Sequence, residues 1–356
     1  MQEATATKRP ATKPRPPAGE PAPLSVAQPR RVAPLLLAWY RRTARDLPWR
    51  RSSDPYRVWL SEVMLQQTQV ERVQDYFRRF LARFPTVTSL ARADEPEVLR
   101  LWEGLGYYRR ARQLHAAARA VVREHGGRFP DTVADLRTLP GVGRYTAAAV
   151  ASIAFGRPEP IVEANSRRVL ARLAGHTGSL AGSRREEPLW QLAASLLPRR
   201  AAGRFNQSLM DLGAMVCTPR RPLCDRCPLA ACCAARRDGT AEAIPARTAR
   251  RETIVIRERA AVYRRGNRVL LERRGPGSWW EGLWDFPRQA PGRTAGPRLG
   301  TITYTVTHHR VTCVVVDADP RTAPRGTGQR WVAVGTLEAL PLSAPGRRIA
   351  RLLAAR

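Results

Sequence analysis

Five of the six cysteines in this chain fall within residues 217–233, which read CTPRRPLCDRCPLAACC. Four of them, separated by six, two and five residues, are candidate metal ligands: Cys217, Cys224, Cys227 and Cys233. Thiolates gathered by one short loop bind zinc or an iron–sulfur cluster. Structural zinc sites usually contain two C-x2-C pairs, whereas this loop has one. The spacing therefore favours an iron–sulfur cluster, with a zinc site of four cysteines as the alternative and Cys232 as the spare cysteine.

The chain is strongly basic: its 356 residues include 61 Lys+Arg against 30 Asp+Glu, a formal net charge of +31. An excess of this size points to a polyanionic partner, with nucleic acid as the leading candidate. A biased, arginine-rich composition explains the scarcity of lysine but not the two-to-one excess of base over acid. The chain contains no apolar run of about 18 residues and no apolar signal core, so we expect no membrane span and a cytoplasmic, nucleoid-associated bacterial protein.

Composition and periodicity divide the chain into four parts. Residues 1–30 are rich in Ala, Pro and Thr and are expected to form a disordered tail. Residues 31–233 have a helical pattern that ends in the cysteine loop, and residues 234–252 are expected to be an Ala/Arg-rich linker. Residues 253–356 change to a period of two, which is typical of strands.

Local signals place several elements within these parts. One helix should begin at Asp54-Pro55, an N-cap followed by proline. In the C-terminal part, two strand-like runs flank Gly266-Asn267, a two-residue hairpin turn, and residues 303–316 are again β-rich. Further helices are expected at residues 70–84, 109–125, 144–155, 163–174 and 186–197.

A glycine-rich stretch, LPGVGRYTAAAV at residues 139–150, places Gly141 and Gly143 just before a helix. Backbone amides in such a turn and at the helix N-terminus form an anion site suited to a DNA phosphate, although a plain helix–helix turn is the alternative. Further along, Glu163 and Asn165 stand at another expected helix start. A carboxylate there is, on its own, typical of a helix cap.

Taken together, the glycine-rich hairpin, the downstream acid and the cysteine loop resemble the helix–hairpin–helix DNA glycosylases that carry a [4Fe–4S] cluster. Within that superfamily the chain resembles the adenine DNA glycosylases of the MutY type, which remove adenine mispaired with 8-oxoguanine. Four stretches carry this resemblance: LPWR (47–50), VWLSEVMLQQTQV (58–70), GLGYYRRARQLH (104–115) and FNQSLMDLGAMVC (205–217). The resemblance implies one [4Fe–4S] cluster per chain. It also implies a monomer whose partner is double-stranded DNA with adenine opposite 8-oxoguanine or guanine.

The resemblance also implies catalytic roles. Glu62 corresponds to the acid that protonates the extruded adenine and later helps to activate water, and its apolar neighbours should raise its pKa. Glu163 stands where members carry an aspartate that stabilises the cationic sugar, with Asn165 orienting a nearby carboxylate. Tyr145 stands where strand-cutting relatives carry a Schiff-base lysine, and residues 14–356 contain no lysine. We therefore expect a monofunctional enzyme in which Tyr145 supports the cationic sugar.

Other positions resemble DNA contacts of the family. Gln67 and Tyr107 correspond to side chains that enter the duplex as wedges. Three residues correspond to a pocket for the extruded adenine: Trp49, Arg50 and Gln207. For each of these residues, ordinary core or surface packing is the alternative.

The stretch WWEGLWDFP, residues 279–287, resembles the approach to the active site of Nudix pyrophosphohydrolases. Those enzymes bind Mg²⁺ through a glutamate-rich helix. Residues 286–316 of this chain contain no Asp or Glu, so we expect no hydrolase site. The resemblance implies instead a domain that recognises 8-oxoguanine through Val306, Thr307 and His308, with valine where well-known members carry phenylalanine.

The sequence therefore predicts a mainly α helix–hairpin–helix glycosylase domain with an iron–sulfur loop, followed by a smaller α+β Nudix-like domain. The predicted function is monofunctional adenine excision. One alternative is a non-catalytic iron–sulfur DNA-binding protein, which would need no acid in a pocket. The other is a glycosylase/lyase of the endonuclease III type, which Tyr145 and the appended domain disfavour.

Overall fold

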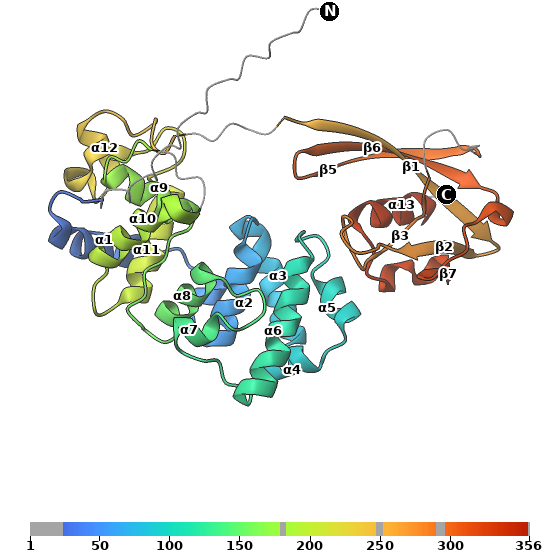
Figure 1. Cartoon of the computed structure of the whole chain (residues 1–356), viewed down its shortest axis with the longest axis horizontal. Coiled ribbons are helices and arrows are strands. Elements are labelled where there is room, and N and C mark those ends of the chain that lie inside the picture. The colour runs from blue at the N-terminus through green and yellow to red at the C-terminus, as the bar shows by residue number, and fades with distance from the viewer. Residues whose placement is uncertain (1–23, 179–182, 247–251, 290–295, 355–356) are drawn as a thin grey trace, which may run out of the picture.

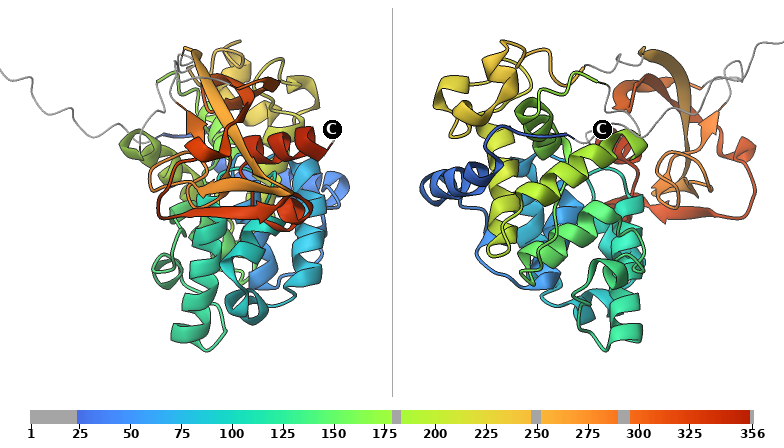
Figure 2. Two further views of the ribbon diagram at one scale, coloured as in Figure 1. Left: turned by 90° about the vertical axis from the view of Figure 1, so that its right-hand side faces the viewer. Right: turned by 60° about the vertical axis from the view of Figure 1, so that its left-hand side comes forward.

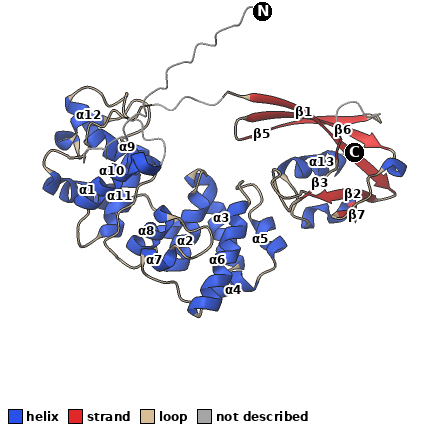
Figure 3. Cartoon of the chain, in the orientation of Figure 1, coloured by secondary structure: helices blue, strands red, loops and turns tan. Residues whose placement is uncertain are grey.

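The computed structural model describes residues 24–178, 183–246, 252–289 and 296–354. It contains a helical domain followed by a smaller domain built on a seven-stranded sheet (Figures 1 and 3). This arrangement confirms the expected mainly α domain with a smaller α+β domain. Among the described residues, no helix is long and apolar enough to cross a membrane.

The helices of the first domain form two groups, each around its own apolar core. In Figure 1, α1 and α9–α12 lie at one end of this domain, and α3–α6 lie at the other, with α2, α7 and α8 between them. The α-helices are α1 (Pro29–Thr43), α2 (Pro55–Leu65), α3 (Val70–Arg83), α4 (Val87–Arg92), α5 (Glu95–Leu101), α6 (Arg109–His125), α7 (Val133–Leu136), α8 (Arg144–Ile153), α9 (Ala164–Leu173), α10 (Ser183–Leu196), α11 (Ala202–Met215) and α12 (Ala234–Arg237).

The helix signals of the sequence have clear physical counterparts. The Asp54 carboxylate accepts a hydrogen bond from the Arg57 amide at 2.9 Å, which caps α2 as expected. In α3, Val73, Phe77 and Phe80 recur at helical spacing and are buried on one face. The five helices expected from periodicity are all present, with ends that differ from the predicted bounds by at most three residues.

The expected boundaries at both ends of the helical domain need correction. Residues 1–23 of the expected tail lie outside the described residues, but α1 begins at Pro29, inside the range assigned to that tail. Residues 234–246 are not a linker, because Ala235 and Ile244 are buried in the core formed by α1 and α9–α11. Alanine-rich sequence resembles a linker by composition, yet its small side chains also permit the close packing found here.

The second domain is a twisted mixed sheet with one long helix against it (Figure 2). Its main path is β3-β2-β1-β6-β5, with β4 paired to β1 and β7 paired to β2. The Gly266-Asn267 turn joins β1 to β2 as predicted, with Arg265 opposite Arg268. The elements are β1 (Ile254–Arg265), β2 (Arg268–Arg273), β3 (Trp284–Asp285), β4 (Arg288–Gln289), β5 (Arg298–Val306), β6 (His309–Ala318), β7 (Gln329–Ala333) and α13 (Ala344–Ala354).

The two domains are joined by an ion pair and by apolar packing. Arg347 of α13 donates from Nε and Nη2 to the two carboxylate oxygens of Glu103, at 2.7 and 2.8 Å. Both side chains are largely buried. Beside them, Leu283 of the second domain is fully buried in the core of the helical domain, and Trp280 packs against that core. The loop after α5 is thus bonded directly to the last helix of the chain.

This ion pair leads to a stability prediction. Arg347→Gln should lower the free energy of unfolding by about 1–3 kcal/mol, because it leaves the largely buried Glu103 carboxylate without its bidentate partner. Urea denaturation followed by tryptophan fluorescence measures the change. Arg351→Gln, at an exposed position of the same helix, is the control and should stay within about 0.5 kcal/mol of wild type. Equal effects of the two changes would contradict the prediction.

Candidate functional site

Glu62 lies on α2 between the two apolar cores and is only 5% exposed. Its Oε2 accepts a hydrogen bond of 2.5 Å from the hydroxyl of Tyr145, near the start of α8. Burial raises the pKa of Glu62 to about 7, the Tyr145 hydrogen bond opposes this shift, and the charge of Glu163 adds to it. A carboxyl with this pKa carries a proton for part of the time near neutral pH, as the sequence predicted. It can therefore donate that proton.

Glu163 is the N-cap of α9. Its Oε1 accepts a hydrogen bond of 2.8 Å from the Ser166 amide, while the Ser166 hydroxyl accepts one of 2.8 Å from the Glu163 amide. Burial raises the pKa of Glu163, and hydrogen bonds from the Asn165 and Ser166 amides oppose the rise. Its charge also raises the pKa of both Glu62 and Tyr145. Glu163 is thus a helix cap whose charge also acts on Glu62 and Tyr145.

Asn165 differs from its expected role of orienting a carboxylate with its side chain. Its Oδ1 accepts a hydrogen bond of 2.9 Å from Arg168, which also donates to the backbone oxygens of Cys217 and Gly213. It is the backbone amide of Asn165 that is directed to Glu163. The side chain is turned toward α11, where a Cβ on Gly213 would come within 2.7 Å of the Asn165 Cβ. Arg168 therefore links α9 to α11 and the cysteine loop, and the Asn165 side chain holds Arg168 within α9.

Of the three residues expected around the extruded base, two share a cavity. Arg50 and Gln207 line a cavity of about 340 Å³. Trp49 is 5% exposed and packs edge to face against Phe77 in the apolar core, with ring centroids 5.5 Å apart. Its packing matches the core alternative rather than the expected pocket role.

Sequence reasoning missed the groups that hold Arg50 and Gln207. Arg50 donates to both carboxylate oxygens of the fully buried Asp211, at 2.6 and 3.0 Å. Tyr40 donates from its hydroxyl to Oε1 of Gln207 at 2.9 Å. The lone acid in the otherwise neutral stretch FNQSLMDLGAMVC was a usable signal for Asp211, because a carboxylate at an apolar helical position needs a cationic partner.

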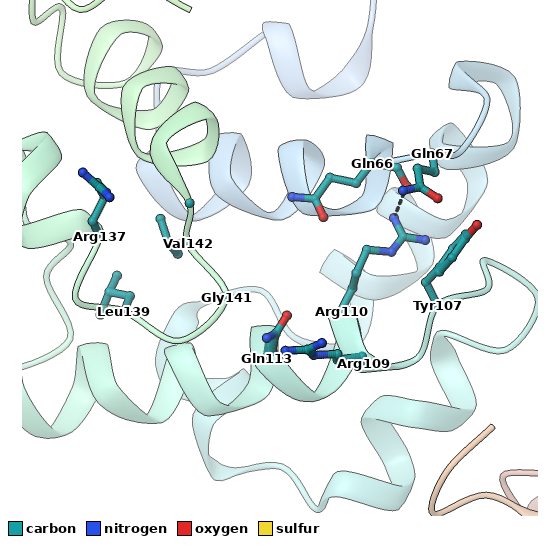
Figure 4. A pocket seen from close by; sticks show the side chains of 11 residues that line it. Gln66, Gln67, Tyr107, Arg109, Arg110, Gln113, Arg137, Leu139, Gly141 and Val142 are labelled. Carbon is teal, nitrogen blue, oxygen red and sulfur yellow. Dashed lines mark hydrogen bonds between the residues drawn. The ribbon is translucent and has the colours of Figure 1, made fainter. Parts of the chain in front are cut away.

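Four of the expected DNA-contacting residues line one cavity of about 550 Å³: Gln67, Tyr107, Gly141 and Gly143 (Figure 4). Tyr107 is 52% exposed, which is unusual for a large aromatic side chain. Gly141 has φ +74°, and a Cβ there would come within 2.6 Å of the Gln113 side chain, so this turn requires glycine. The hairpin and the two expected wedges therefore face a common space.

Thr307 and His308 form the turn between β5 and β6. Thr307 has φ +53°, and its hydroxyl lies 3.3 Å from Nδ1 of His308. A cavity of about 680 Å³ between the two domains is lined by Thr307 from one side and by Tyr107 from the other. The same cavity is lined by Trp279, whose ring centroid lies 5.1 Å from that of His309. The expected lesion-reading turn and the expected wedge thus border one cavity.

The four candidate ligand cysteines line one cavity together with Arg172. Arg172 Nη1 donates to Sγ of Cys217 at 3.2 Å. Burial raises the pKa of the Cys227 thiol to about 12. Cys232 is 1% exposed and packs in the apolar core, in agreement with its assignment as the spare. Within the described ranges, no group of three or more His, Cys, Asp or Glu side chains stands at the spacing of ligands to a metal ion.

Both domains match known family models. Residues 60–194 match the HhH-GPD superfamily of base excision DNA repair proteins, and residues 259–352 match the NUDIX domain. A solved structure of a thermostable thymine-DNA glycosylase is 31% identical, with a TM-score of 0.53 over 59% of this chain and 97% of that chain. A trapped endonuclease III–DNA covalent intermediate, 22% identical, has a TM-score of 0.51 over 60% of this chain and 97% of that chain and shows the same helical fold.

The chain is also similar to curated adenine DNA glycosylases. The protein of Buchnera aphidicola subsp. Schizaphis graminum is 36% identical over 71% of this chain and 73% of its own length. The protein of Mycobacterium tuberculosis is 45% identical over 58% of this chain and 69% of its own length. The human protein is 48% identical over 56% of this chain, and the match spans 38% of the human protein. The chain covers little more than half of the rat and mouse relatives, 55% and 51%.

The raised pKa of Glu62 predicts a pH-dependent stability. The unfolded chain loses this proton near pH 4.5, whereas the folded protein keeps it to about pH 7, so the contribution of Glu62 to stability falls as pH rises through this window. Glu62→Gln removes the titration and keeps an oxygen that accepts from Tyr145. Its free energy of unfolding, relative to wild type, should therefore increase by about 2–3 kcal/mol between pH 5 and pH 8.

Urea denaturation at the two pH values measures this difference. Glu242→Gln, at an exposed glutamate of the same domain, is the control, and its free energy of unfolding relative to wild type should be the same at both pH values. The same result for Glu62→Gln would contradict the prediction.

Proposed function

Since the chain belongs to the adenine DNA glycosylase family, we propose that it hydrolyses the N-glycosidic bond of adenine in double-stranded DNA. Adenine opposite 8-oxoguanine or guanine is the proposed substrate. The observation that carries this proposal is the buried Glu62 carboxyl, whose pKa of about 7 lets it hold a transferable proton beside the carboxyl of Glu163. A purely DNA-binding protein would have no use for so costly a buried acid.

The proposed reaction begins when adenine is extruded from the duplex, because a stacked base cannot reach a buried acid. Glu62 donates its proton to N7 of the ring, and the electrons of the breaking N-glycosidic bond pass to the base. Glu163 stabilises the positive charge that grows on the sugar. Glu62, now ionised, accepts a proton from the water that adds to the sugar. Tyr145 orients Glu62 through its hydrogen bond.

The capping geometry supports a role for Glu163 despite its extra methylene relative to aspartate. By folding back to the Ser166 amide, the side chain keeps its carboxylate at the start of α9. There its charge acts on both Glu62 and Tyr145. We propose that this carboxylate fills the place of the usual aspartate.

Strand cleavage through a lysine Schiff base is not part of the proposal. The sequence has no lysine from residue 14 to residue 356, and Tyr145 stands at the corresponding position. Water is therefore the proposed acceptor of the sugar, and the product is an abasic site in an unbroken strand.

We further propose that the cysteine loop holds one [4Fe–4S] cluster through Cys217, Cys224, Cys227 and Cys233. The residues fit such a group, because four thiols line a single cavity and Arg172 donates to one of the sulfurs, a contact that favours the anionic thiolate. When bound, the cluster would cross-link the loop and fix its shape. Arg168 then ties this loop to α9 through the backbone oxygen of Cys217.

The second domain is proposed to read the base opposite adenine. The turn that carries Thr307 and His308 lies at a cavity shared with Tyr107, so a base beside the wedge is within reach of both domains. A hydroxyl and an imidazole provide donors and acceptors suited to 8-oxoguanine. In the described part of residues 286–316 there is no carboxylate to hold a divalent metal for Nudix hydrolysis.

The excision proposal is tested with duplexes that carry adenine opposite 8-oxoguanine or guanine. The wild-type protein should give strand breaks only after alkali treatment. Glu163→Gln should lower the single-turnover rate at least about 100-fold while keeping binding, because its amide oxygen can still cap α9. Glu163→Asp should be tolerated far better. Breaks without alkali would indicate a lyase, no breaks would contradict the function, and a wild-type rate for Glu163→Gln would make Glu163 a helix cap only.

The cluster proposal predicts brown protein with about four irons per chain. Replacing any of the four cavity cysteines by serine should reduce the iron content and the visible absorption. Cys232→Ser is the matched control and should retain both, because its side chain packs in the apolar core. Colourless protein with one zinc per chain would contradict the cluster, and loss of iron in Cys232→Ser alone would show that the wrong ligand was chosen.

A further inference from the structure

Two loops meet at the 550 Å³ cavity, and each has a non-glycine residue in the left-handed backbone region. Gln67, between α2 and α3, has φ +57°, and Tyr107, before α6, has φ +50°. Side chains with a Cβ rarely adopt this conformation and keep it only where surrounding contacts enforce it. Something must therefore hold both loops.

The contacts that hold them converge on Arg110 of α6, which is 8% exposed. Its guanidinium donates to the carbonyl that precedes each strained residue: to Gln66 O at 2.5 Å (Figure 4) and to Gly106 O at 3.1 Å. Four further acceptors lie between 2.9 and 3.2 Å: Val63 O, Met64 O, Leu105 O and Thr68 Oγ1. One side chain thus supplies donors to both loops.

The chemistry of this contact is specific to arginine. The planar fork presents donors in two directions, whereas a lysine ammonium is a compact charge that cannot reach both sets of carbonyls in the same way. The guanidinium carbon also lies 5.6 Å from the centroid of the Tyr107 ring and 5.4 Å from that of Trp102. Burial lowers the pKa of Arg110 to about 10, so the group remains charged at neutral pH.

From this geometry we propose that Arg110 is a positioning residue that fixes Gln67 and Tyr107 as one rigid pair, so that both enter the duplex together. The inference rests on the proposed function, because it gives the two side chains a joint role at the mismatch. Without the guanidinium, each loop is free to leave the left-handed conformation and must be reordered when DNA binds. That cost lowers affinity for the mismatch more than it lowers the rate of bond cleavage in the bound complex.

A double-mutant cycle tests the proposal. Binding is measured with duplexes that carry 2-aminopurine next to the adenine–8-oxoguanine mismatch, whose fluorescence reports unstacking, and single-turnover excision is measured at saturating protein. Gln67→Ala and Tyr107→Ala should each weaken binding at least about fivefold in the wild-type background. Arg110→Lys alone should weaken binding about tenfold, with the saturated excision rate changed less than about threefold. In the Arg110→Lys background, each alanine replacement should weaken binding less than about twofold.

Arg109→Lys is the matched control. Arg109 is the preceding residue, is exposed and lines the same cavity, so the control repeats the chemical change without touching the two loop carbonyls. In the Arg109→Lys background, the two alanine replacements should weaken binding as much as they do in the wild-type background. Additive losses of binding affinity in the Arg110→Lys background would overturn the proposal.

Two further outcomes are separable. If Arg110→Lys fails to fold, as judged by thermal melting, Thr68→Val replaces it in the cycle. This change removes one acceptor of the guanidinium and leaves the charge of Arg110 in place. Additive losses of binding affinity in the Thr68→Val background also overturn the proposal. If the wild-type protein binds the duplex but does not excise adenine, the proposed function fails. The cycle, which is read in binding and fluorescence, still decides the role of Arg110.

Discussion

The hydrogen bond between Tyr145 and Glu62 is the contact on which the proposed chemistry of the helical domain depends. It joins α8 to α2 between the two apolar cores, and it gives a buried carboxyl a partner that carries no charge. A cationic partner would lower the pKa of Glu62 and keep it ionised, whereas a phenol leaves the effect of burial dominant. The Tyr145 hydroxyl also gives the carboxyl a hydrogen-bond partner that does not compete with it for its proton. The acid–base character of the site thus follows from the neutral hydroxyl of Tyr145 as much as from the burial of Glu62.

The other charged side chains in this region each have specific hydrogen-bond partners. Arg50 is paired with Asp211, Arg167 is paired with Glu186, and Arg168 donates to backbone oxygens and to Asn165. Glu163 receives backbone amides instead of a salt bridge. Glu62 and Glu163 are thus bonded to a phenol and to backbone amides, whereas the buried Asp211 is paired directly with Arg50. The excess positive charge of the chain remains available at exposed positions, where it suits a polyanion.

Many elements of both domains could be predicted because their signals are local. Asp54 caps α2, apolar residues repeat at helical spacing in α3, and Gly266-Asn267 turns the first hairpin, each through contacts among neighbours in sequence. The partners of these elements were not predictable in this way. Asp211 reaches Arg50 across 161 positions and Arg168 reaches the backbone oxygen of Cys217 across 49, because tertiary packing decides which polar group lies nearest. The packing of Trp49 against Phe77 in the apolar core is also a tertiary contact that the sequence alone does not indicate. Arg110 escaped notice because nothing in the sequence distinguishes a buried arginine from the many exposed ones.

The ion pair between Glu103 and Arg347 has a consequence for the proposed binding of DNA. Glu103 immediately precedes the glycine-rich loop that carries Tyr107, so α13 is bonded next to the proposed wedge and not at a distant surface. A duplex held by the helical domain would then meet the second domain at an effective concentration set by a rigid joint instead of a floppy tether. Under these conditions two individually weak binding surfaces would act together as one high-affinity surface, without any new contact to DNA.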